Sequence, residues 1–170
     1  MHYRPLTPDD APAFVALRLA GLQDHPEAFA SSYEEESSTP LTEIRPRLEA
    51  GARQVVIGAF DGPSLIGVAG LEREAMAKLS HKAGLWGMYI APSARGRGIG
   101  AELIQTALNY AASAWGVRQV NLRVNTRNQS AVALYLKLGF VQFGLEHDSL
   151  LINGEYHDEY EMAYVVRSEA

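Results

Sequence analysis

The chain has 170 residues, of which 47 % are hydrophobic, and this length and composition predict a single globular domain over residues 1–170. The sequence contains no cysteine, which excludes disulfides, a cysteine nucleophile and thiolate metal sites. Its formal net charge of −5 disfavours nonspecific binding to nucleic acid, and no apolar run approaches the roughly 18 residues of a membrane span. The first residues lack the basic and apolar regions of a signal peptide, so we expect a cytoplasmic location.

The N-terminal part of the sequence predicts one short strand followed by two helices. We expect the strand over residues 2–6. Residues 7–10, Thr-Pro-Asp-Asp, are typical of a helix start, because Thr is a favoured N-cap, Pro suits the first position and acids suit the first turn. A second helix is expected over residues 39–51, where Pro46 predicts a kink or a split.

The remainder of the sequence predicts strands that alternate with helices. Residues 54–60 and 65–71 are apolar runs that flank an Asp-Gly turn, which indicates a β-hairpin. A long helix with one buried stripe is expected over residues 98–115. The other expected elements are strands at 85–90, 119–125, 140–146 and 159–166 and a helix at 130–138.

A turn rich in glycine and arginine, residues 95–100 (Arg-Gly-Arg-Gly-Ile-Gly), joins the strand at 85–90 to the long helix. Its glycines let the backbone approach a phosphate, and the first-turn N–H groups of the helix lack intrahelical partners. A P-loop would need Lys followed by Ser or Thr at its end, which this turn lacks. A loose dinucleotide fingerprint also fits, but the next strand carries no acid to bind a ribose. We therefore expect a phosphorylated cofactor.

Two segments resemble the CoA-binding motifs of the GNAT N-acetyltransferases. Residues 95–100 resemble the signature Arg/Gln-x-x-Gly-x-Gly/Ala, and residues 128–140 resemble Asn-x-x-Ala-x-x-Leu-Tyr-x-x-x-Gly-Phe, in the expected order. The resemblance implies an α+β fold with a central, mostly antiparallel twisted sheet of about 6–7 strands, splayed at the CoA-binding strand, and about four helices. It also implies acetyl-CoA as the co-substrate.

The resemblance assigns three kinds of cofactor contact. The splayed strand would offer backbone groups to the pantetheine arm, the turn would bind the pyrophosphate through its N–H groups, and the second motif would complete the site. Arg97 could also reach the 3′-phosphate. The expected cofactor-binding residues are Met88, Tyr89, Ile90, Arg95, Gly96, Arg97, Gly98, Ile99, Gly100, Asn128 and Tyr135.

Two catalytic residues are expected, an acid and a base. Tyr135 is the candidate acid, because a phenol of pKa about 10 near a departing thiolate of pKa about 8.5 can supply a proton. Many members of the family carry a Glu on the strand before the turn, where this chain has Gly84. We expect Glu72 on the neighbouring strand to replace it, with Glu74, His81 or a water chain as alternatives.

The acceptor is expected to meet residues 28–36, because the region between the first two helices covers the acceptor site in GNAT folds. Phe29, Tyr33 and Glu34 are the expected contacts, and the run of three glutamates there would attract a polyamine or a basic peptide. The implied reaction is direct acetyl transfer to a primary amine of a small molecule or peptide.

Three other functions stay open at this point. They are transfer from another acyl-CoA, a non-catalytic acyl-CoA-binding sensor and a dinucleotide oxidoreductase. No metal site is expected, because the five histidines include no pair at i, i+4 spacing. A homodimer is compatible with the sequence and not required by it.

Overall fold

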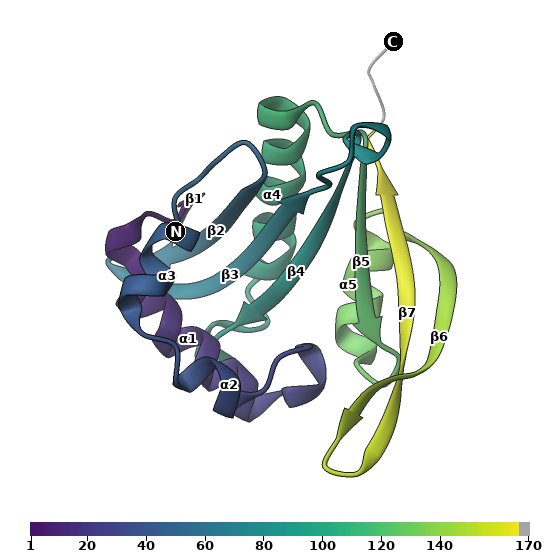
Figure 1. Cartoon of the computed structure of the whole chain (residues 1–170), viewed down its shortest axis with the longest axis horizontal. Helices are drawn as coiled ribbons and strands as arrows, with labels where there is room; N and C mark the ends of the chain where they lie inside the picture. The colour runs from purple at the N-terminus through teal and green to yellow at the C-terminus, as the bar shows by residue number, and fades with distance from the viewer. Residues whose placement is uncertain (167–170) are drawn as a thin grey trace.

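The computed structural model describes residues 1–166 and contains one seven-stranded sheet of order β1-β2-β3-β4-β5-β7-β6 (Figure 1). The strands are β1 (His2–Pro5), β2 (Gln54–Asp61), β3 (Ser64–Arg73), β4 (Lys82–Ile90), β5 (Gln119–Asn125), β6 (Val141–Ile152) and β7 (Glu155–Val165). The helices within these residues are α1 (Ala11–Asp24), α2 (Tyr33–Ser37), α3 (Leu41–Arg47), α4 (Ile99–Trp115) and α5 (Gln129–Lys137). Short 3₁₀ turns are η1 (Pro8–Asp10), η2 (Pro26–Ala28), η3 (Ala77–Leu79) and η4 (Pro92–Ala94).

The sheet is mostly antiparallel, since every neighbouring pair of strands is antiparallel except β4 and β5. This confirms the predicted α+β class. In the described residues, no helix is long and apolar enough to cross a membrane.

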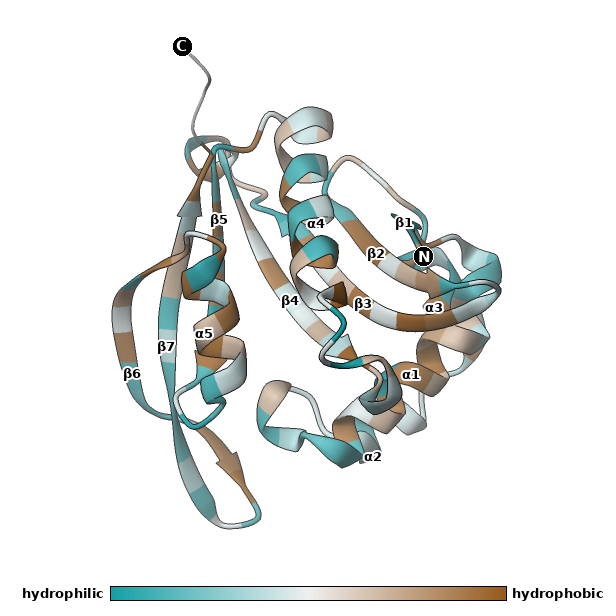
Figure 2. Ribbon diagram, turned by 180° about the vertical axis from the view of Figure 1, so that it is seen from behind, coloured by the Kyte–Doolittle hydropathy of each residue, from teal (hydrophilic) through white to brown (hydrophobic). Residues whose placement is uncertain are grey.

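The two faces of the sheet carry separate hydrophobic cores. The larger core joins α4 and α5 to the strands, and both helices lie on the face of the sheet seen in Figure 2. Its fully buried members include Leu103, Ile104 and Leu108 of α4. The smaller core joins α1 to β2, β3 and β4 on the opposite face and includes Phe14 and Leu22. Figure 1 shows α1, α2 and α3 over the β2–β4 side, whereas the β5-β7-β6 side has no helix on that face in the described residues.

The parallel pair β4 and β5 separates after a short ladder. Residues 82–84 of β4 pair with residues 119–121 of β5, and residues 85–90 of β4 have no partner on β5. A bulge bends β4 at this point, because Gly87 and Met88 together oppose one residue of β3. Gly87 has φ of +61°, a conformation that glycine adopts without steric penalty. The splay that the family resemblance implies is therefore present.

The structure differs from the sequence prediction mainly at helix ends and in the last hairpin. The helix expected from residue 7 begins at Ala11, after η1, and the helix expected over residues 39–51 is the shorter α3. The short helix α2 was not predicted, although Ser32 and Glu35 form a capping box in which the Glu35 N–H donates to Ser32 Oγ at 3.2 Å. β6 and β7 extend beyond their expected bounds into a long hairpin.

The chain start is fixed by an ion pair between β1 and η1. Arg4 donates from Nη1 to Oδ2 of Asp10 at 2.7 Å and from Nη2 to Oδ1 at 2.9 Å. The backbone N–H of Thr7 also donates to Asp10, at 2.7 Å. The hydrogen bond from Arg4, opposed by burial, lowers the pKa of Asp10 to about 2. The ionised carboxylate therefore stabilises the folded chain above its unfolded pKa, and this contribution is lost as the pH falls toward 2.

We expect Asp10→Asn to lower the free energy of unfolding by about 1 kcal/mol at pH 7, because it weakens an ion pair in which the Arg4 side chain is 39 % exposed and the Asp10 side chain 14 %. The difference from the wild type should shrink as the pH falls from about 4 toward about 2. Urea denaturation at several pH values measures both effects. Asp9→Asn makes the same charge change at a neighbouring side chain that is 99 % exposed, and it should change stability by less than about 0.5 kcal/mol. Equal losses in the two variants would contradict a specific role for Asp10.

Candidate functional site

A cavity of ≈ 510 Å³ lies where β4 and β5 separate, between β4, the glycine-rich turn and α5. It brings together residues that are far apart in the sequence. Of the predicted cofactor-binding residues, those that line it are Met88, Tyr89, Ile90, Arg95, Gly96, Gly98, Ile99, Gly100, Asn128 and Tyr135.

The glycine-rich turn is shaped for close approach of a ligand to its backbone. Gly96 and Gly98 have φ of +74° and +76°, and Gly98 is the N-cap of α4. A Cβ at Gly98 would meet no atom within 4 Å, so the space in front of this residue is open. The N–H groups of the first turn of α4 lack intrahelical partners and lie at the positive end of the helix dipole. The turn can therefore bind an anion such as a pyrophosphate.

The two arginines of the turn make contacts outside the cavity. Arg97 does not line it and instead reaches Asp61 at the end of β2, with Nη2 3.3 Å from Oδ2. Arg95 folds back toward α1, donating from Nε to the Ile90 carbonyl at 3.0 Å and from Nη2 to Asp24 at 3.1 Å. Its side chain therefore connects the turn to the end of α1.

Tyr135 lies on α5 and is only 6 % exposed, with its ring edge-on to Phe140 at 5.5 Å between centroids. Burial raises the pKa of its phenol well above the ordinary value, so the hydroxyl keeps its proton at neutral pH. The described side-chain hydrogen bonds include none to this hydroxyl. Asn128 caps α5, since its Oδ1 accepts from the Ala131 N–H at 3.2 Å. Both residues border the cavity, as the second motif predicts.

A second, smaller cavity of ≈ 80 Å³ lies at the point of separation and is lined from both faces of the sheet. It shares Met88, Asn128 and Tyr135 with the larger cavity. On its other side it is bordered by two carboxylates, Glu27 of η2 and Glu159 of β7, neither of which we expected from the sequence. The full lining is Glu27, Ala28, Leu85, Trp86, Gly87, Met88, Arg123, Val124, Asn125, Asn128, Ala131, Tyr135 and Glu159.

The structure does not bring Glu72 to these cavities. Glu72 is exposed on β3 and lines none of the pockets described for residues 1–166. It pairs with Gly84, which in turn pairs with Asn121 of β5, so it lies where the β4–β5 ladder is still closed. A Cβ at Gly84 would meet nothing within 4 Å, so the position where family members carry a base is open space.

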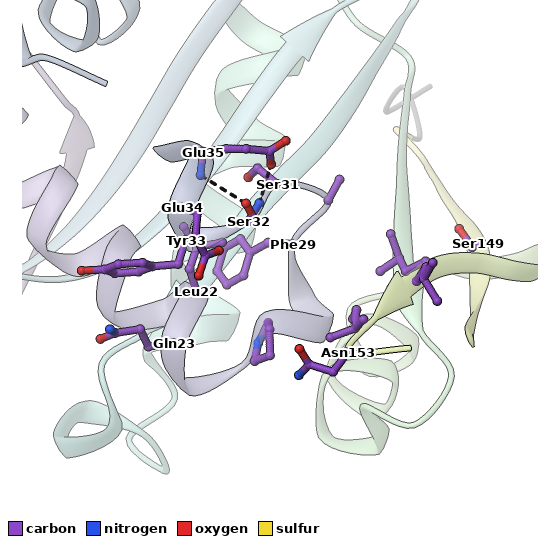
Figure 3. A pocket seen from close by; sticks show the side chains of 15 residues that line it. Leu22, Gln23, Phe29, Ser31, Ser32, Tyr33, Glu34, Glu35, Ser149 and Asn153 are labelled. Atoms are coloured by element: carbon purple, nitrogen blue, oxygen red, sulfur yellow. Dashed lines mark hydrogen bonds between the residues drawn. The ribbon is translucent and has the colours of Figure 1, made fainter. Parts of the chain in front are cut away.

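A third cavity, of ≈ 660 Å³, lies between the α1–α2 segment and the tip of the β6–β7 hairpin (Figure 3). The three expected acceptor residues, Phe29, Tyr33 and Glu34, all line it. Figure 3 shows Asn153 at the tip of the hairpin, opposite the segment that carries Phe29. Phe29 is also part of the smaller core and packs on Tyr89 at 6.3 Å between centroids.

A largely buried ion pair joins α1 to α2 and lies next to Gly87 of β4. Arg18 donates from Nε and Nη2 to both carboxylate oxygens of Glu36, at 2.6 and 2.7 Å. Burial raises the pKa of Glu36, but the hydrogen bonds and charge of Arg18 outweigh it, and the pKa falls below its ordinary value. A Cβ at Gly87 would come within 2.6 Å of Arg18 Nη1. Gly87 is thus required both for the bulge and for this close packing.

We compared the sequence and the fold with those of known proteins. The model of the Acetyltransferase (GNAT) family matches residues 20–140. The crystal structure of an acetyltransferase of the GNAT family from Streptococcus pneumoniae has a TM-score of 0.86 at 26 % identity, over 97 % of this chain and 99 % of that chain. A putative acetyltransferase from Salmonella typhimurium, solved with its cofactor acetyl-CoA, has a TM-score of 0.86 at 16 % identity, over 100 % and 96 % of the two chains. The latter likeness concerns the fold.

Among curated proteins, the spermidine N(1)-acetyltransferase of Vibrio cholerae is 34 % identical to this chain over 89 residues. The match covers 52 % of this chain and 51 % of that protein, so the chain spans about half the length of this relative.

We expect Gly98→Val to weaken binding of acetyl-CoA by at least about 100-fold, which corresponds to about 2.7 kcal/mol. The new side chain would fill the space in front of the turn and would also be strained at this φ, by about 1–2 kcal/mol. Isothermal titration calorimetry measures the affinity.

Gly116→Val is the matched control for Gly98→Val. Gly116 follows α4 at its opposite end, has φ of +64° and also has no atom within 4 Å of a Cβ. This variant should lose similar stability and keep the wild-type affinity. Unchanged affinity in Gly98→Val would show that the anion site lies elsewhere.

Proposed function

The chain belongs to the acetyltransferase (GNAT) family, as its two motifs predict, and we propose that it is an acetyl-CoA-dependent N-acetyltransferase that acts on a primary amine. One observation carries the proposal. A single cavity joins the start of α4, where an anion can bind, the part of β4 that is not paired with β5, and the side chain of Tyr135. These are the three features that binding a CoA thioester and releasing its thiol require.

The residues present fit acetyl-CoA. The N–H groups around Gly98 would bind the pyrophosphate. Met88 lies in the part of β4 that has no partner on β5, so its backbone groups are available to the amides of the pantetheine arm. Ile90 lies in the same part of β4, but its carbonyl already accepts a hydrogen bond from Arg95 Nε. The cavity volume of ≈ 510 Å³ is within the range typical of ligand sites.

Tyr135 would hold and deliver a proton when the thiolate departs. Its burial keeps the phenol protonated, and it borders both the cofactor cavity and the smaller cavity where the sheet opens. Transfer would be direct from thioester to amine, because the chain has no cysteine to carry the acetyl group.

Acidic side chains on the acceptor side support a cationic acceptor. Glu34 and Glu35 line the cavity between the α1–α2 segment and the β6–β7 hairpin, and Glu27 and Glu159 line the smaller cavity. Among the residues that line these two cavities, Arg123 is the only arginine or lysine, and it is paired with Glu146 and Glu161. A positively charged amine on a small molecule or a peptide would be attracted to this side.

We expect acetyl-CoA to stabilise the chain by about 2.7 kcal/mol at roughly 100-fold excess over Kd, and NAD to do much less. Spermidine, spermine, amino acids and short peptides should then be screened for release of free CoA thiol. Because the chain has no cysteine, a thiol reagent detects the released CoA without a signal from the protein itself. Tight binding with no turnover of any amine would favour the sensor alternative, and an equal shift with NAD would contradict the CoA site.

Tyr135→Phe tests the proposed acid. Removing one oxygen should lower kcat by about 10²-fold with little change in acetyl-CoA affinity, because the proton matters only as charge develops on sulfur. The loss should shrink as the pH rises. Tyr110→Phe, in a tyrosine that packs edge-on to Trp115 at the far end of α4, is the control and should be silent. A wild-type rate in Tyr135→Phe would make Tyr135 a packing residue, and a parallel loss of affinity would give its hydroxyl a binding role.

A further inference from the structure

We infer that Glu27 is the general base of the reaction and that His25, fixed by Arg95 of the cofactor-binding turn, positions its carboxylate. The inference rests on the acetyl transfer proposed above. The reaction needs a general base, because an amine with pKa near 10 arrives protonated and must lose a proton before it attacks. Gly84, which stands where many family members carry that base, cannot supply it.

Glu27 lies where a base is needed. It borders the small cavity at the separation of β4 and β5, the same cavity that Tyr135 borders from the opposite side. The next residue, Ala28, lines both this cavity and the larger cofactor cavity. The side chain of Glu27 is 28 % exposed, so a proton that it takes from an acceptor can pass on to solvent.

A directed chain of hydrogen bonds orients Glu27. Arg95 has only donors, so its Nη1, 3.2 Å from Nε2 of His25, requires the lone pair on that nitrogen. The proton of a neutral His25 is then on Nδ1, which lies 3.0 Å from Oε1 of Glu27 and donates to it. Asp24 holds Arg95 from the other side by accepting from Nη2 at 3.1 Å. One oxygen of Glu27 is thus occupied, and Oε2 is left for the acceptor.

Glu159 is the competing carboxylate, and the geometry favours Glu27. Glu159 already accepts a hydrogen bond of 2.6 Å from Ser149 Oγ and lies on β7, with β5 between it and β4. It borders the small cavity but not the cofactor cavity, whereas Glu27 is adjacent to a residue that borders both. The other charged or titratable groups around this cavity are Arg123 of β5 and Tyr135 of α5.

The proton balance of the step is complete. The acceptor arrives as an ammonium ion, and Glu27 takes one proton and later releases it to solvent. The nitrogen lone pair forms the C–N bond to the acetyl carbonyl carbon, and the C–S bond breaks with its electron pair leaving on sulfur. The second nitrogen proton passes to solvent as the amide forms. Tyr135 gives its proton to sulfur and regains one from solvent, so the released product is a thiol and one net proton is released.

Glu27→Gln tests the base while keeping the size of the side chain. With an acceptor that the wild type acetylates and whose pKa is near 10, kcat/KM at pH 7 should fall about 10²–10⁴-fold. Acetyl-CoA affinity should not change. The loss should shrink as the pH approaches the pKa of the amine, and it should be small for an acceptor amine with a pKa below 7, which arrives already deprotonated. A purely structural role for Glu27 would give the same loss for both amines.

Two further carboxamide variants separate the alternatives. Glu159→Gln should lose much less kcat/KM than Glu27→Gln. The ratio of its kcat/KM values for high- and low-pKa amines should stay at the wild-type ratio. Glu49→Gln, at an exposed glutamate outside the cavities, controls for the change in net charge. Glu27→Asp, which shortens the same carboxylate by one methylene, should retain part of the rate. It supplies the test if Glu27→Gln does not fold.

His25→Ala tests the positioning role, because it removes the Nδ1 donor to Glu27. It should lower kcat by about 10-fold and change acetyl-CoA affinity less than that, since His25 also borders the cofactor cavity. The double variant with Glu27→Gln should have a kcat no lower than that of Glu27→Gln alone. Full additivity would overturn the link between the two residues.

A near-wild-type kcat/KM for Glu27→Gln with a high-pKa amine would overturn the inference, above all if Glu159→Gln lost activity. Such a result would leave the proposed function intact. Failure of the wild type to acetylate any amine would instead contradict the proposed function and this inference with it.

Discussion

The architecture of the site depends on one break in a ladder of backbone hydrogen bonds. In a closed sheet, residues 85–90 of β4 would pair with β5, and their N–H and C=O groups would be satisfied internally. The bulge at Gly87 turns β4 away from β5, and the backbone groups on that side of β4 are then available to a ligand, except the Ile90 carbonyl, which accepts from Arg95. The packing of α4 and α5 on one face keeps the two strands in one sheet despite this loss, because Leu103, Leu122 and Tyr135 share one core.

The same break makes the cofactor and acceptor sides neighbours. The small cavity is lined by α5 from one face of the sheet and by η2 from the other. Arg18 fixes the α1–α2 segment over Gly87, and Arg95 ties the end of α1 to the cofactor turn. The Arg95–Asp24 contact therefore holds the proposed acceptor side in place relative to the proposed cofactor site.

Features encoded within a few residues were predictable, whereas contacts between distant segments were not. The turn at residues 95–100 could be recognised because a positive φ at Gly96 and Gly98 demands glycine locally. Glu27 and Glu159 are 132 positions apart in the printed sequence, and only the strand order brings them to one cavity. Glu72 lies beside Gly84, as the order of the strands indicates, but the sequence does not reveal that β5 still pairs with β4 at Gly84, so the sheet opens only further along β4.

The helices on the two faces differ in how much of the core they form. α4 contributes seven buried residues, from Ile99 to Trp115, whereas α2 and α3 contribute none. Substitutions on the solvent-facing and cavity-facing sides of α2 thus remove little buried apolar area, and a fold of this kind can tolerate many of them. Exposed positions of α2 that line the proposed acceptor cavity, such as Glu34, are therefore free to diversify under selection, or to be redesigned in the laboratory, while the buried scaffold around the proposed cofactor site stays constant.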